Sequence, residues 1–224
     1  THKEIDKLIV PSNHSKDCFI NTAYEAIDNQ QNLKTILKCD CPVEVVPYPV
    51  KNMTPDHLDM SFDTDFNFLS IALLGARKNL DNMINWFVEE FKDENVGLIL
   101  KTATSTGSNI DYENTRQLLE RILSKKQGNR KCKVFLLHGD LSEEQIHSLY
   151  VRDDINAYIT TTHGEGYGLP IFESAYSGLP VVATNWSGHL DFLEAKVKEK
   201  KKIKLKKLFA EVDFELKEIP KKVV

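Results

Sequence analysis

The chain has 224 residues and a net charge of −4, with 41% hydrophobic and 28% charged residues. This composition is typical of a globular protein of roughly one domain plus extensions, and it gives no basic field for binding nucleic acid. No apolar run approaches the ~20 residues of a membrane span and no signal peptide opens the sequence, so we expect a cytoplasmic protein.

The first 50 residues read as a separate unit with a βαβ-like pattern. Strands are expected at residues 6–11 and 43–47, and a helix is expected at residues 15–27. We therefore divide the chain into residues 1–50 and residues 51–224, the latter with a lysine-rich extension at its end.

The second unit alternates between apolar strands and helices. Strands are expected at residues 66–74, 96–101 and 133–137, with helices at residues 80–91 and 112–123 between them. This alternation predicts an α/β fold with a Rossmann-like, doubly wound parallel sheet. Right-handed crossovers bring the carboxyl ends of such strands to one edge, where these sheets bind ligands.

Residues 162–193 carry the strongest signal for a binding site. A strand expected at residues 155–161 runs into three glycines at alternate positions, which tolerate unusual backbone angles and let a ligand approach the main chain. Pro170 then stands at a good first position for a short helix. The free N–H groups and the positive dipole end of that helix would face the loop, which favours an anion such as a diphosphate.

Two carboxylates belong to this stretch, Glu165 in the loop and Glu173 about one turn into the helix. We expect both to line one cleft, where carboxylates hold sugar hydroxyls. The glycine spacing fits neither the phosphate loop of ATPases nor the dinucleotide fingerprint. The sequence E-G-Y-G-L-P-I-F-E, followed by S-A-Y-S-G-L-P-V-V, resembles the E-x7-E signature of retaining glycosyltransferases of family 4, which have the GT-B fold.

The resemblance extends to the strand at residues 66–74, whose following loop carries basic residues for the donor diphosphate in the family. Arg77 and Lys78 would take that role here. They are adjacent, whereas the common family pattern spaces its two cations apart, so we expect one of them to point away from the phosphates and favour Lys78 as the contact. The loop H-G-D-L-S around Gly139 corresponds to the family's largely main-chain contact near the nucleotide base.

The resemblance also implies roles within the glycine loop. Glu165 would meet the transferred sugar near its third hydroxyl, and Glu173 would hold the ribose hydroxyls. Main-chain N–H groups of residues 168–172 would stabilise the diphosphate. The donor contacts expected in this stretch are Gly166, Tyr167, Gly168 and Leu169.

The implied activity is transfer of a sugar, with retention at the anomeric carbon, from a UDP-, GDP- or ADP-sugar to a saccharide, lipid or protein acceptor. We expect a same-face displacement assisted by the leaving phosphate, in which Glu165, Lys78 and Arg77 are the catalytic residues. No cofactor and no metal are expected to be required. The alternatives are a non-catalytic or truncated nucleotide-sugar-binding module and a nucleotide-sugar epimerase.

Residues 1–50 resemble the family's stretch leading into the hinge, through I-V-P-S and V-V-P-Y-P-V. This weaker match implies that the chain enters near the end of an acceptor-binding domain. A GT-B enzyme has two Rossmann-like domains with the reaction between them, so we expect this chain to be about half an enzyme that binds donor.

Four further features are weaker evidence of function. Asp63-Thr-Asp65 copies the D-x-D metal site of another fold but precedes a strand, and we interpret it as linker. His163 is a candidate substrate contact and His189 a weaker one. The eight lysines of residues 195–207 favour a solvated hairpin edge over a polybasic membrane patch. The four cysteines show no zinc spacing and are expected to be reduced thiols.

Overall fold

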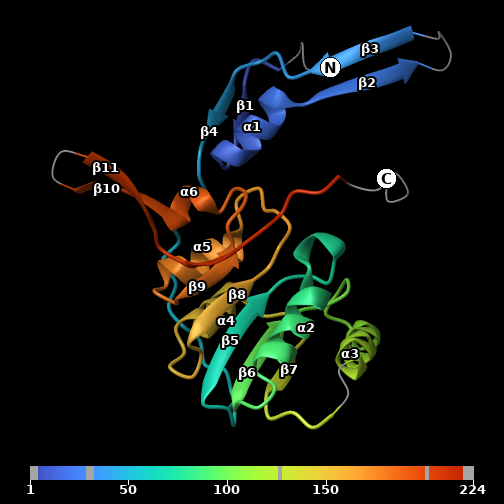
Figure 1. The fold of residues 1–224 in the computed structure, drawn as a ribbon, viewed down its shortest axis with the longest axis vertical. Coiled ribbons are helices and arrows are strands. Elements are labelled where there is room, and N and C mark those ends of the chain that lie inside the picture. The colour runs from blue at the N-terminus through green and yellow to red at the C-terminus, as the bar shows by residue number, and fades with distance from the viewer. Residues whose placement is uncertain (1–4, 29–32, 126–127, 200–201, 219–224) are drawn as a thin grey trace.

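The computed structural model describes residues 5–28, 33–125, 128–199 and 202–218. Within these residues the main body is a parallel sheet with the strand order β12-β9-β8-β5-β6-β7 (Figure 1). Its strands are β5 (Phe66–Ile71), β6 (Val96–Lys101), β7 (Lys133–Leu137), β8 (Ala157–Thr160), β9 (Val181–Thr184) and β12 (Ala210–Val212).

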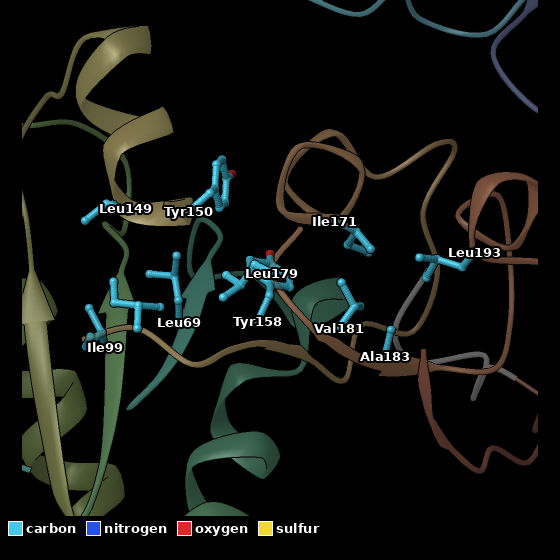
Figure 2. Close-up of a cluster of buried hydrophobic side chains, with 11 residues drawn as sticks. Leu69, Ile99, Leu149, Tyr150, Tyr158, Ile171, Leu179, Val181, Ala183 and Leu193 are labelled. Atoms are coloured by element: carbon cyan, nitrogen blue, oxygen red, sulfur yellow. The ribbon is translucent and has the colours of Figure 1, made fainter. Parts of the chain in front are cut away.

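Helices cover both faces of this sheet because its strands are apolar on both sides. In β6, Leu98 and Leu100 belong to the core beneath α2 (Leu80–Glu90) and α3 (Asn109–Ser124). Ile99 points the opposite way, into the core formed with α4 (Glu143–Tyr150), α5 (Leu169–Tyr176) and α6 (Leu190–Leu193) (Figure 2). The doubly wound sheet expected from the sequence is therefore confirmed.

The strand order reverses at β5, the central strand of the winding. From β5 the chain proceeds outward through β6 and β7, then crosses back through α4 to β8 on the other side of β5. The loops that follow β5 and β8 consequently lie next to each other at the carboxyl edge. Open α/β sheets bind ligands at such a switch point.

The N-terminal unit contains a parallel strand pair, β1 (Leu8–Val10) with β4 (Val43–Val45), and the helix α1 (Asn13–Asn21). The helix expected at residues 15–27 is wrong in its second half. The chain leaves α1 at Thr22 in an extended conformation, and β2 (Ala23–Asp28) pairs antiparallel with β3 (Leu33–Lys38), forming a hairpin that projects from the unit (Figure 1). Pairing with a distant segment overrides the local helical pattern here.

Residues 46–63 connect the two units without a helix or strand. They lie along α4, where the hydroxyl of Ser148 accepts a hydrogen bond from the Asp56 N–H at 2.7 Å. Arg152 donates to the carbonyls of Leu58 and Met60. Asp63, the first residue of the D-x-D sequence, forms an ion pair with Lys133 of β7.

The lysine-rich segment forms an antiparallel hairpin, β10 (Glu194–Glu199) with β11 (Lys202–Lys207), which projects from the sheet between α6 and β12 (Figure 1). The described side chains of β11 are exposed throughout. Among the described residues, no helix is both long enough and apolar enough to cross a membrane.

Candidate functional site

The glycine loop between β8 and α5 is held in place by the turn that follows β9. The Glu165 N–H donates to Ser187 Oγ at 2.8 Å, and the Gly188 N–H donates to the Glu165 carbonyl at 2.9 Å. A Cβ atom on Gly188 would lie 2.2 Å from the Gly166 carbonyl oxygen, so only glycine allows this approach. The main chain at Glu165 is thus fixed from both sides.

The side chain of Glu165 forms the centre of a charged cluster. The short 3-10 helix η2 (Ala76–Lys78) after β5 brings both cations to it: Lys78 Nζ lies 2.6 Å from one carboxylate oxygen and Arg77 Nη1 lies 2.8 Å from the other. Thr162 Oγ1 adds a hydrogen bond of 3.0 Å. The side chain of Glu165 is only 9% exposed and that of Lys78 20%, whereas Arg77 is 57% exposed.

These contacts decide the ionisation of Glu165. Burial by itself would raise the pKa of this carboxyl, but the hydrogen bonds and positive charges of Lys78 and Arg77 outweigh burial and hold the pKa below its ordinary value of 4.5. Both cations contact the same carboxylate, and which of them would contact the phosphates stays a prediction. Lys78 is the more buried of the two.

Helix α5 begins beside this cluster with a free N-terminus. Gly168 precedes the helix in a left-handed conformation with φ of 91°, and no side chain caps the first turn. Helix α4 differs, because Ser142 and Gln145 form a reciprocal capping box there. The uncapped N–H groups of α5 are available to an anionic ligand.

A hollow of about 550 Å³, here called the strand-end hollow, lies at the carboxyl ends of β5, β6 and β7. Arg77, Lys78, Gly139 and Pro170 line it, and so does Thr102, whose buried hydroxyl has no hydrogen-bond partner among the described residues. Gly139 adopts a φ of 94°, and its carbonyl accepts a hydrogen bond from Lys101 Nζ at 2.6 Å. The hollow therefore joins the cations, the start of α5 and the Gly139 loop.

Glu173 lies in different surroundings from Glu165. It lines a hollow of about 290 Å³, here called the helix hollow, together with Lys51, His147 and Leu169. The buried hydroxyl of Tyr150 donates to its carboxylate at 3.0 Å. Burial raises the pKa of Glu173, and the Tyr150 hydrogen bond and the nearby His147 only partly oppose that rise.

Glu165 instead lines a third hollow, here called the loop hollow, with Arg77, His163 and Trp186, between the glycine loop and α1. Its volume is about 430 Å³. The sequence predicted a single cleft for the two glutamates; in the structure Glu165 lines the loop hollow and Glu173 lines the helix hollow. Glu173 lies more than one turn into α5 and faces α4, whereas Glu165 precedes the Gly168 turn and faces η2.

Three expected contacts have main-chain or packing roles. The Tyr167 side chain is buried against Tyr48, Phe172 and Phe192, with ring centroids 5.0–5.4 Å away. The Gly166 carbonyl accepts hydrogen bonds from Ser15 of α1 and from the N-cap residue Ser12. His189 is fully buried, and its Nε2 donates to the Thr184 carbonyl at 2.7 Å, which is a structural role.

Sequence reasoning missed two sets of residues around the site. Tyr150 ends α4 within an ordinary apolar stripe, and only the rule that a buried tyrosine hydroxyl finds a partner could have drawn attention to it. Ser12, the N-cap of α1, and Ser15 within α1 donate to the Gly166 carbonyl at 2.5 and 3.1 Å, and Asp191 accepts from the Asn13 N–H at 2.7 Å. These contacts join segments about 150 or more residues apart.

Comparison with known proteins identifies a family that the chain matches. Residues 60–206 match the family described as Glycosyl transferases group 1. The serotype-specific mannosyltransferase WbdA of Escherichia coli is 32% identical over 119 residues, which are 52% of this chain and 13% of that protein. The chain thus spans a small part of the curated relatives it matches.

Solved structures agree on the fold. Sucrose-phosphate synthase from Thermosynechococcus elongatus superimposes with a TM-score of 0.58 and 18% identity, over 84% of this chain and 42% of that one. TarM gives a TM-score of 0.55 and 16% identity, over 95% of this chain and 34% of that one. These likenesses confirm the expected Rossmann-like GT-B fold, and the match over residues 60–206 shows that the chain belongs to the glycosyl transferases group 1 family.

Proposed function

We propose that this chain is the donor-binding half of a retaining glycosyltransferase that uses a nucleoside diphosphate sugar. The observation that carries the proposal is the cluster at the switch point, where Arg77 and Lys78 meet Glu165 next to the uncapped start of α5. Two cations and a free helix N-terminus suit a diphosphate, and the family match makes a sugar nucleotide the corresponding ligand.

The separation of the two glutamates supports this ligand. A nucleoside diphosphate sugar carries its ribose and its transferred sugar on opposite sides of the diphosphate. Glu173 in the helix hollow would bind the ribose hydroxyls, and Glu165 in the loop hollow would meet the sugar. Arg77 and Lys78 line the strand-end hollow, where the diphosphate would lie, with the base towards the Gly139 loop.

Charge stabilisation would be the main catalytic contribution of this half. The bond between the anomeric carbon and the diphosphate oxygen breaks, so negative charge grows on the departing diphosphate. Lys78, Arg77 and the N–H groups at the start of α5 are positioned to stabilise that charge electrostatically. In this scheme the chain's own cations and amides supply the stabilisation that a metal ion supplies elsewhere.

Retention would follow from a displacement on one face of the sugar. The acceptor oxygen bonds to the anomeric carbon on the face that the diphosphate leaves, and its proton passes to a departing phosphate oxygen. Glu165 is poorly suited to covalent attack because a cation holds each of its carboxylate oxygens. A glycosyl adduct on Glu165, trapped and identified by mass spectrometry, would contradict this step.

Calorimetric titration of UDP, GDP and ADP, each with and without magnesium, tests the proposal. We expect saturable binding of one nucleotide that does not depend on magnesium and that Glu173→Ala weakens about tenfold or more, since a hydrogen bond to a charged group contributes about 1.5–3 kcal/mol. Glu143→Ala is the matched control, because Glu143 lines the same hollow but pairs with Lys51. Failure of all three nucleotides to bind, or equal effects of both variants, would refute it.

A further inference from the structure

Both tryptophans of the chain line a single hollow outside the three described above. The chain contains two tryptophans, Trp86 on α2 and Trp186 after β9, and both contribute to a cavity of about 560 Å³. Phe214, from the segment that follows β12, lines it as well. We call this hollow the tryptophan cleft and define it by these three residues with Asn82, Asp213 and Glu215.

The aromatic rings of the tryptophan cleft are only partly covered. Trp86 is 52% exposed and Phe214 is also exposed, although both rings could contribute more stability in the core. Trp186 packs between Phe214, at a centroid distance of 5.1 Å, and His14 of α1, at 5.2 Å. Aromatic faces gathered around an open cavity provide an apolar surface for a ligand.

The polar groups of the tryptophan cleft are mainly hydrogen-bonding and acidic. Asn82 donates its amide N–H to Asn79 at 2.7 Å, which leaves its side-chain carbonyl without a partner among the described residues. The carboxylate of Asp213 and the indole N–H of Trp186 are likewise unpaired within the described part of the chain. Glu215 forms an ion pair with Lys217, which also lines the cleft, and both side chains are 76% exposed. With two carboxylates against one lysine, the lining suits a ligand rich in hydroxyl groups better than an anion.

A hexose ring has an apolar face and hydroxyl groups, and the cleft has aromatic rings and polar groups that can bind each of them. Its C–H faces pack against flat aromatic rings, and its hydroxyl groups donate to carboxylate and amide oxygens and accept from an indole N–H. The combination of two indoles, a phenyl ring, an amide and carboxylates around one cavity therefore matches an uncharged saccharide better than a peptide or a nucleotide.

The position of the tryptophan cleft relates it to the proposed reaction. His163 and Trp186 line both this cleft and the loop hollow that contains Glu165 and Arg77. The indole nitrogen of Trp186 would lie 3.9 Å from a Cβ atom on Gly164, directly beside the glycine loop. A saccharide lying in the cleft therefore has one end next to the carboxylate assigned to the transferred sugar.

We propose that the tryptophan cleft binds an uncharged oligosaccharide acceptor, whose hexose rings pack on Trp86 and Trp186 and whose reactive end enters the loop hollow. The role of this saccharide as an acceptor, with its reactive end in the loop hollow, rests on the proposed glycosyltransferase function. Saccharide binding itself rests only on the cleft.

Intrinsic fluorescence reports on this site because both indoles of the chain line it, although Trp186 also lines the adjacent loop hollow. The full chain is titrated with mannotriose, maltotriose and cellotriose, and with a trisaccharide of galacturonic acid as the charged comparison. We expect at least one neutral trisaccharide to give a saturable change in tryptophan emission, and the charged one to bind at least fivefold more weakly.

Variants on one helix separate the cleft from the rest of the surface. Asn82→Ala removes a cleft residue and is expected to weaken binding about fivefold to tenfold. Asn85→Ala removes the same side chain from α2 where it only bonds the Asp81 carbonyl, and binding should stay within twofold. Trp86→Ala, followed by saturation-transfer NMR of the ligand, should abolish detectable binding, with circular dichroism confirming that the variant is folded.

Each result has a definite meaning. No change in emission with any neutral trisaccharide, stronger binding of the charged one, or equal binding by the Asn82 and Asn85 variants would overturn the inference. If nucleotides bind but trisaccharides do not, the acceptor cleft is wrong and the donor function stands. If trisaccharides bind in the cleft but nucleotides do not, the donor function is wrong and the saccharide site stands.

Discussion

Glu165 and Glu173 belong to one nine-residue motif, yet the protein surrounds them in opposite ways. Glu165 has a cation on each carboxylate oxygen and a lowered pKa. Glu173 has one tyrosine hydroxyl as its hydrogen-bond donor, and burial raises its pKa. Cations neutralise the first carboxylate, whereas the second has an oxygen without a partner among the described residues, which can accept hydrogen bonds from hydroxyl groups. Environments that differ this much assign different tasks to identical side chains.

The largest expected effect comes from removing the buried cation of Glu165. Lys78→Ala should lower the free energy of unfolding by about 2–3 kcal/mol, because a buried carboxylate loses its better-shielded partner. Arg77→Ala should cost less than about 1 kcal/mol, since the Arg77 side chain is more than half exposed. Urea denaturation of both variants measures the difference.

A double variant identifies the source of that loss. Lys78→Ala combined with Glu165→Gln should recover part of the stability lost in Lys78→Ala, because the unpaired buried charge is gone. If the stability lost in the double variant equals the sum of the losses in Lys78→Ala and Glu165→Gln, the ion pair does not stabilise the fold. The comparison between the two glutamates would then rest on Glu173 alone.

The raised pKa of Glu173 predicts a pH dependence of nucleotide binding. A neutral carboxyl group accepts weaker hydrogen bonds than a carboxylate, so affinity should fall as the pH drops from 7 towards and below the raised pKa, which lies above 4.5. The expected loss between pH 7 and pH 4.5 is about threefold to tenfold by calorimetry. In Glu173→Gln, which cannot titrate, this loss should be absent.

The lowered pKa of Glu165 predicts that acid reduces the stability of the fold. Its ion pairs contribute stability that is fully present above the ordinary pKa of 4.5 and is lost as the pH falls through the lowered value. The free energy of unfolding, measured from pH 6 to pH 3, should therefore decline less steeply in Glu165→Gln than in the parent chain. Parallel curves would show that the carboxylate is not stabilised in the folded state.

The smallest expected effect concerns the single donor to Glu173. Tyr150→Phe removes one hydrogen bond without changing the ring, and it should cost about 1 kcal/mol of stability. Chemical denaturation measures this loss, and Tyr158→Phe, which removes a 3.3 Å hydrogen bond to the Ile71 carbonyl, provides a buried control. An unchanged pH dependence of nucleotide binding in Tyr150→Phe would show that this hydroxyl does not tune Glu173.

Local sequence signals were sufficient for most of the sheet and its helices. The strands expected at residues 96–101 and 133–137 have those bounds in the structure, because continuous apolar runs leave little choice of conformation. Helix α3 begins three residues earlier than expected, at Asn109, with Ser108 as its cap. The β2–β3 hairpin was missed because each strand depends on its partner.

The site was predictable only in part. The motif identified Glu165 and Glu173, and the strand order explains why the loops after β5 and β8 meet. The ion pairs between Arg77, Lys78 and Glu165 join residues nearly 90 positions apart, which no local pattern reveals. Each glutamate lines a different hollow because of the turn at Gly168 and the hydrogen bond from Tyr150. Neither feature has a distinctive sequence signal.

The hydrogen bonds from Ser12 and Ser15 to the Gly166 carbonyl have a mechanical consequence. Their acceptor is the carbonyl of the residue that directly follows Glu165, and their donors belong to the N-terminal unit. Any displacement of α1 from the sheet must therefore break these bonds or carry the glycine loop with it. The distance between the two units and the position of the Glu165 carboxylate therefore change together. An opening or closing movement of the N-terminal unit against the sheet would also alter the geometry of the charged cluster.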